Sequence, residues 1–259
     1  MSAEAAERPR SGAGTPNDQA LPRPWGFWST LLWGLLAFLL GAFLVFGAVF
    51  LINGGSLDSL PETQEAPWKD PWLPLQLILI NLIQIAVVAL AARLSGWPIG
   101  TYFALVRPRR RDLLFGFAAL LLVLGALEIL THLVGRSSVT PFQTDAYEAA
   151  RAAGLVPLMW IAFVVAAPVG EEIVFRGFLF RGWAASRLGA PGTVLATSLI
   201  FAASHLQYDW FGLMQTFCIG ALFAWLRWRS GSTVVTIVLH MLVNFVATTW
   251  AVVKVEGLL

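Results

Sequence analysis

The chain has 259 residues, of which 58% are hydrophobic and only 12% are charged, and its mean hydropathy is +0.72. A soluble domain carries about 25% charged residues, so this composition excludes an ordinary soluble protein and predicts a membrane protein. The single cysteine, Cys218, excludes a disulfide framework and a cysteine-rich metal site. The net charge of +2, with basic residues in short runs beside apolar segments, gives no indication of nucleic-acid binding.

Apolar runs organise nearly the whole chain after a polar start. Residues 1–24 are rich in Ala, Pro, Gly, Ser and Arg, which predicts a disordered cytoplasmic tail. The first apolar run is too long for a signal-peptide core and no cleavage site follows it, so we expect it to remain as a spanning helix. The runs together predict an all-α bundle of about seven transmembrane helices. The expected spans are 25–52, 73–92, 113–133, a fourth that begins near 155, and then 192–205, 211–226 and 233–253.

Arginines mark every second connection between these spans. The connections 93–111, 181–187 and 227–229 are basic, whereas the alternate connections hold few basic residues. Because basic loops stay in the cytoplasm, the chain is expected to have its amino terminus inside and its carboxyl terminus outside. The fifth span is short, so a re-entrant arrangement near His205 is an alternative.

Two parts of the membrane region are distinguished by content. Residues 25–134 are expected to form amino-terminal transmembrane helices without catalytic residues, and residues 155–253 are expected to form the catalytic core. The segment between them, about 135–154, has mixed charges and is expected to be a loop.

The core carries the motif Glu171-Glu172-x-x-x-Arg176 inside an apolar run. A charged group at bilayer depth costs roughly 2.5–3.5 kcal/mol or more, so such residues usually have a function. Glu172 and Arg176 are four apart and are expected to pair on one helix face. Glu171 points about 100° away and is left free. Pro168 is expected to kink the helix beside the carboxylates.

Two later segments each add a histidine with a companion at helical spacing. Phe201 precedes His205 by four residues, and His240 precedes Asn244 by four. A carboxylate and an imidazole can draw a proton from water, and a second imidazole with an amide N–H can hold a negative oxygen. The residues also allow a second chemistry, a zinc site formed by Glu171, His205 and His240 with one open position.

This order of motifs resembles the CAAX-protease and bacteriocin-processing family of intramembrane endopeptidases, also called the abortive-infection family. The resemblance covers roughly residues 155–249, and every motif position matches. It implies an all-helical membrane core whose site faces the cytoplasm, here of the bacterial plasma membrane. It implies that Glu171 and His205 activate water, and that His240 and Asn244 stabilise the oxyanion. The expected partners are membrane lipid and a membrane-associated peptide, prenylated or bacteriocin-like, with Zn²⁺ as an open question.

Simpler interpretations exist for each motif. The Glu171-Glu172-Arg176 cluster could extend its charges to the membrane interface, His205 could be an interfacial aromatic, and the other histidine pair could hydrogen-bond between helices. Phe201 is expected to be a packing wall. Glu128 and His132, also four apart, are expected to form a structural pair or an outer-loop contact.

Two other functions remain as alternatives to a protease. One is a non-catalytic immunity or scaffold protein with the same fold. The other is a small transporter that uses Glu171 and the histidines as a proton relay.

Overall fold

The structure is a computed structural model that describes residues 21–52, 54–55 and 67–258, and within these ranges every regular element is a helix. The all-α membrane bundle is therefore confirmed. The long helices are α1 (Phe27–Ile52), α2 (Leu73–Leu94), α4 (Arg110–Leu133), α9 (Gly189–Ala203), α10 (Trp210–Ser230) and α11 (Thr233–Val255). Short helices are η2 (Pro67–Lys69), α3 (Ile99–Tyr102) and α5 (Pro141–Ala152).

One long helix, residues 156–184, carries the Glu171-Glu172 motif, and we call it the motif helix. Its successive turns are α6 (Val156–Trp160), η3 (Ile161–Ala166), α7 (Ala167–Glu172), η4 (Ile173–Leu179) and α8 (Phe180–Ala184). The helix continues to Ala184, so the motif lies near its middle.

Each of the seven predicted spans corresponds to a helix. Five of the described helices are long and apolar enough to cross a membrane: α1, α2, α4, the motif helix and α11. The fifth predicted span, α9, is shorter and ends at Ala203, two residues before His205.

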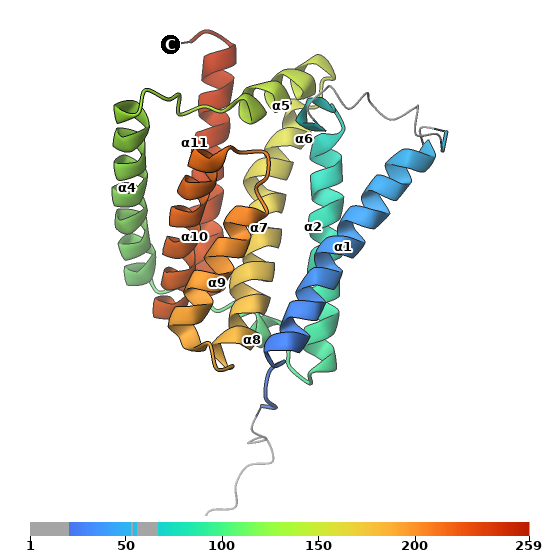
Figure 1. Cartoon of the computed structure of the whole chain (residues 1–259), viewed down its shortest axis with the longest axis vertical. Helices are drawn as coiled ribbons and strands as arrows, with labels where there is room; N and C mark the ends of the chain where they lie inside the picture. Colours follow the sequence, from blue (N-terminus) through green and yellow to red (C-terminus); the bar gives the residue numbers. More distant parts are fainter. Residues whose placement is uncertain (1–20, 53, 56–66, 259) are drawn as a thin grey trace, which may run out of the picture.

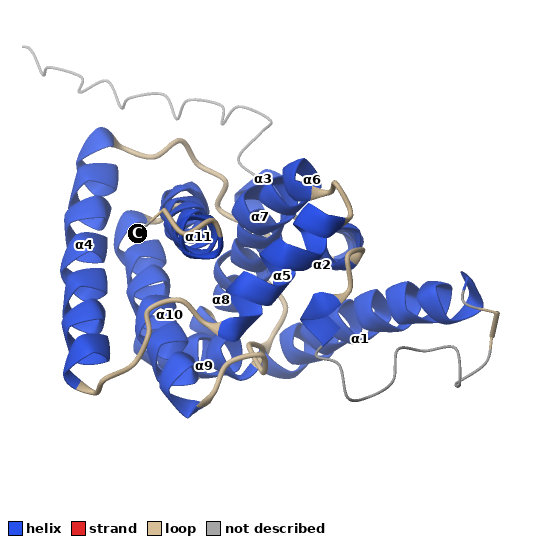
Figure 2. Cartoon of the chain, turned by 90° about the horizontal axis from the view of Figure 1, so that it is seen from above, coloured by secondary structure: helices blue, strands red, loops and turns tan. Residues whose placement is uncertain are grey.

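The helices run up and down, with the motif helix in the middle (Figures 1 and 2). It contacts α2, α11, α9 and α1, whereas α4 stands at one edge beside α10 and α11. In the most apolar 18-residue stretch of the motif helix, 50% of the residues are buried inside the protein, whereas in the corresponding stretches of α1 and α4 only 17% are buried. The charged motif is therefore surrounded by protein and not by lipid.

Glycine allows two helices to approach the motif helix closely. A Cβ at Gly170 would lie 2.0 Å from Asn81 Oδ1 of α2, and a Cβ at Gly182 would lie 2.0 Å from Thr30 Oγ1 of α1. A side chain at either position would collide with its neighbour, so these glycines set the helix spacing. The amino-terminal helices thus pack directly on the motif helix.

The segment 135–154 was expected to be a loop, and this prediction is wrong because it contains α5. Thr140 and Gln143 form a capping box at its start, with the Thr140 N–H donating to Gln143 Oε1 at 2.8 Å. One face of α5 is buried through Ala146, Tyr147 and Ala150. The helix lies across the upper end of the bundle in Figure 1.

Candidate active site

The motif helix changes its hydrogen-bond pattern on both sides of the carboxylates. Residues 161–166 and 173–179 form π turns, which are frequent at functional sites. Pro168 has no N–H to donate to the carbonyl of Val164, which accounts for the irregular turn before the motif. Side chains from other helices use the carbonyls of these turns: Asn244 Nδ2 donates to Phe163 O at 2.8 Å, and Arg227 Nε donates to Arg176 O at 3.0 Å.

Glu172 and Arg176 form the buried ion pair that their spacing predicted. Arg176 Nη1 lies 2.9 Å from Glu172 Oε1, and both side chains are completely buried. Arg176 also donates to Gly220 O at 2.9 Å and lies over the ring of Phe201. His240 Nδ1 donates to the same Glu172 oxygen at 2.9 Å. A buried charge pair is tolerated when its partners and hydrogen bonds are present, as here.

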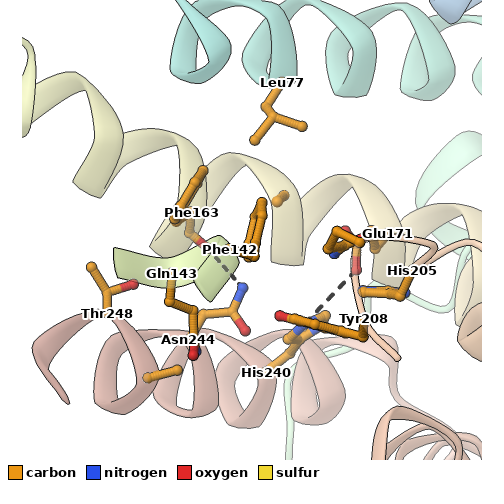
Figure 3. A pocket seen from close by; sticks show the side chains of 13 residues that line it. Leu77, Phe142, Gln143, Phe163, Glu171, His205, Tyr208, His240, Asn244 and Thr248 are labelled. Carbon is orange, nitrogen blue, oxygen red and sulfur yellow. Dashed lines mark hydrogen bonds and ion pairs between the residues drawn. The ribbon is translucent and has the colours of Figure 1, made fainter. Parts of the chain in front are cut away.

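A cavity of about 140 Å³ lies beside this ion pair, and it is large enough for several water molecules at roughly 30 Å³ each. Glu171, His205, His240 and Asn244 all line it (Figure 3). The structure thus brings together the four residues for which the sequence predicted catalytic roles, from three separate segments. The catalytic roles themselves stay predictions.

Glu171 is the carboxylate that reaches the cavity. Its Oε2 lies 3.8 Å from His240 Nε2, beyond hydrogen-bond distance, and it has no hydrogen-bond partner among the described residues. Its side chain is 24% exposed, whereas the Glu172 side chain is fully buried. The expected division between a free and a paired carboxylate is therefore what the geometry shows.

The sequence placed His205 on the fifth helix, but it lies in the turn between α9 and α10. Its Nδ1 donates to Phe201 O at 2.7 Å, so Nε2 is left for the cavity. The rings of Phe201 and His205 have centroids 4.7 Å apart, so the two residues still pack together although the helix has ended.

Phe201 packs against both the Arg176 guanidinium and the His205 ring. It is 2% exposed and packs against Phe175, His205 and His240, with the Arg176 guanidinium carbon 4.4 Å from its ring centroid. This placement agrees with the packing wall that we expected.

Several cavity residues were not predicted as site residues. Tyr208 stacks on His205 with ring centroids 6.0 Å apart, and Phe142 of α5 meets Tyr208 edge-on at 5.8 Å. Burial, followed by the nearby Glu171 carboxylate, raises the pKa of Tyr208 to about 12. The spacing of three from His205 is a signal in the sequence that could have identified Tyr208. The other unpredicted lining residues are Leu77, Gln143, Phe163, Ala167, Gln207, Ala247 and Thr248.

The expected zinc ligands do not form a metal site as they are placed. Among the described residues, no group of three or more His, Cys, Asp or Glu side chains is arranged to hold a metal ion. We therefore derive no step through zinc.

Glu128 and His132 form a pair away from the cavity. Glu128 Oε1 lies 3.0 Å from His132 Nε2 and accepts from Ser138 Oγ at 2.5 Å, and both side chains are at least half exposed. This is the structural pair with a loop contact that we expected.

Comparison with known families matches residues 153–246 to the Rce1-like family, described as type II CAAX prenyl endopeptidase Rce1-like. The matched stretch contains every residue of the three motifs. The similarity to this family is therefore shown for this stretch of the chain. The match confirms the resemblance drawn from the motifs over residues 153–246 and supports a CAAX-type protease fold there, and the five long apolar helices indicate an integral membrane protein.

A curated relative comes from Escherichia coli and is described as an uncharacterized 24.3 kDa protein. It is 33% identical over 107 residues, which cover 39% of this chain and 47% of the relative. The chain thus spans about half the length of the curated relative that it matches. No solved structure matches the chain.

Proposed function

We propose that the protein is an intramembrane endopeptidase in which Glu171 and His205 activate a water molecule. One observation carries this proposal: a carboxylate, two imidazoles and a carboxamide from three segments line one cavity inside an apolar bundle. Hydrolysis of a buried peptide bond needs such a combination of water, proton acceptor and oxyanion donors.

The proposed reaction uses the free groups of the cavity. Water loses a proton to Glu171 or to His205 Nε2 while its oxygen adds to the peptide carbonyl carbon. The carbonyl oxygen becomes negative on the side of His240 and Asn244. The C–N bond then breaks, the acyl part keeps the water oxygen, and the proton passes to the leaving amine.

The hydrogen bonds of His240 and Asn244 qualify their proposed role. Neutral His240 donates from Nδ1 to Glu172, so its Nε2 can donate to an oxyanion only when the ring is protonated. Asn244 uses one amide proton on Phe163 O and keeps the other. His240 and Asn244 therefore offer few free N–H groups to the oxyanion, and a further hydrogen-bond donor would be needed to stabilise it.

The proposed substrate is a peptide segment at the membrane, with lipid as the surrounding partner. Leu77, Phe142, Phe163, Ala167 and Ala247 give the cavity apolar walls that fit apolar side chains. The name of the matched family makes fluorogenic prenylated peptides suitable first probes, beside unmodified apolar peptides.

Alanine substitutions test the proposal on purified protein in detergent. Glu171→Ala and His205→Ala should each abolish cleavage while the protein inserts and purifies normally. Glu128→Ala and His132→Ala are matched controls, because they remove the same groups away from the cavity, and they should retain full activity. Turnover that persists in Glu171→Ala would refute the proposal. Complementation of a deletion strain by that variant would favour a scaffold, and transport driven by a pH gradient in sealed vesicles would favour a transporter.

A further inference from the structure

The cavity extends from the carboxylates in one direction only. On the motif helix the cavity is lined by Glu171, Ala167 and Phe163, so it extends from Glu171 toward the beginning of that helix. On α11, which runs the opposite way, the cavity is lined by His240, Asn244 and Thr248, so it extends from His240 toward the end of that helix. Both series lead toward the end of the bundle that α5 covers, and α5 itself contributes Phe142 and Gln143.

In the other direction the bundle is closed. Below Glu171 the next layer holds the fully buried pair of Glu172 and Arg176. Phe175, Phe201 and Phe223 surround it, and none of them is more than 2% exposed. A peptide could pass this layer only by breaking the buried ion pair, so access from that end is blocked.

The two ends of the described structure differ in charge. The closed end carries arginines at the ends of α2, α8 and α10 and before α4. These residues are Arg93, Arg107, Arg109, Arg110, Arg111, Arg181, Arg187, Arg227 and Arg229, with Asp112 as their acidic neighbour. The open end has a mixed and mostly acidic set. Its members are Lys69, Asp70, Glu128, Arg136, Asp145, Glu148, Arg151, Asp209, Lys254 and Glu256.

We infer that the cavity receives its substrate from the side of the membrane opposite the cytoplasm. Arginine-rich connections remain in the cytoplasm, and here they all lie at the closed end. The sequence led us to expect both an amino-terminus-inside topology and a site that faces the cytoplasm, and the direction of the cavity is incompatible with having both. Because the arginines lie at the closed end, we retain the amino-terminus-inside topology and give up the site that faces the cytoplasm.

The partner that fits this opening is a peptide segment exposed at the outer membrane surface. Its cleavage rests on the proposed function, whereas the direction of access does not. A prenylated peptide that stays in the cytoplasm would meet the closed end. An exported peptide, or the outer segment of a membrane protein, would meet α5 and the cavity.

Thiol labelling in intact cells tests the direction of access without any need for activity. In a Cys218→Ala background, single cysteines are placed at the open-end surface (Glu148→Cys), in the cavity (Gln143→Cys) and at the closed-end surface (Arg109→Cys). An impermeant maleimide should label Glu148→Cys and Gln143→Cys in intact cells. It should label Arg109→Cys at least tenfold less until the cells are permeabilised.

The reverse pattern would overturn the inference, as would a Gln143→Cys thiol that reacts only together with Arg109→Cys or stays unreactive after permeabilisation. A fluorogenic apolar peptide added outside intact cells gives an independent readout. Labelling as expected, with no cleavage that depends on Glu171, would leave the direction of access standing and reject the proposed function.

Discussion

Two hydrogen bonds decide which nitrogen of each histidine is available to the cavity. Phe201 O holds His205 Nδ1, and the Glu172 carboxylate holds His240 Nδ1. In both neutral rings the lone pair is therefore on Nε2. This arrangement suits proton acceptance well, but it leaves few free N–H donors for a negative oxygen.

We therefore predict that Tyr208 donates a hydrogen bond to the developing oxyanion. Its hydroxyl points into the cavity toward the side that carries Asn244 (Figure 3), and its raised pKa keeps it protonated over the working pH range. Tyr208→Phe keeps the ring stacked on His205 and removes only the hydroxyl. Loss of one such donor should lower kcat by about 10²–10³-fold, with KM within about threefold. Tyr147→Phe, which removes a hydroxyl that donates to Glu256 outside the cavity, is the matched control and should retain full activity. A kcat close to that of the unaltered protein would exclude this role.

Glu172 should be far more important for stability than an exposed carboxylate. Glu172→Gln leaves Arg176 buried without a counter-charge, and removal of one partner of a buried pair costs about 3–5 kcal/mol. Glu128→Gln breaks an exposed pair and should cost at most about 1 kcal/mol. Thermal unfolding in detergent compares the two variants. Equal melting temperatures would show that the buried pair has no such effect.

Among the helices, close contacts to the motif helix determine where the carboxylates lie. Gly170 touches Asn81 of α2, and Gly220 of α10 provides a carbonyl for Arg176 and lies against Phe201. The irregular turns on either side of α7 are stabilised by Asn244 and Arg227 from α11 and α10. Small changes in helix spacing should therefore displace the cavity residues.

Gly170→Ala tests this dependence. Its Cβ would lie 2.0 Å from Asn81 Oδ1 and 2.8 Å from Asn81 Cβ, so rotation of the Asn81 side chain cannot relieve the collision. We expect a lower melting temperature and at least a tenfold loss of cleavage. The control is Gly125→Ala in α4, which has nothing within 4 Å and should be neutral or stabilising by up to about 1 kcal/mol. Similar results for both variants would contradict the argument.

For the whole molecule, the amino-terminal helices are part of the site and not an accessory. We expected residues 25–134 to contribute only helices, yet Leu77 lines the cavity and α2 carries the buried polar residues Gln76, Asn81 and Gln84. A buried amide in a membrane protein needs a protein neighbour, and Asn81 has Gly170 of the motif helix, which packs against α2.

Expression of the chain as two fragments should show that cleavage depends on the amino-terminal helices. A break in the exposed connection after Gly135 leaves α1 to α4 on one fragment and the Rce1-like segment on the other. Spanning helices insert independently and then associate, so the co-expressed fragments should co-purify and recover cleavage. The carboxy-terminal fragment alone should be inactive and should aggregate. Full activity of that fragment on its own would show that the first half is dispensable.

Hydropathy, charge and helical spacing were sufficient to predict the helical class, the spans, the Glu172–Arg176 pair and the four cavity residues, because these signals are local. These signals did not predict α5, the turn that carries His205, or which nitrogen of each histidine forms a hydrogen bond. There the deciding contacts join distant positions: Glu172 and His240 are 68 residues apart, and Phe163 and Asn244 are 81 apart. Such contacts follow from how the helices pack against one another, and so does the direction in which the cavity opens.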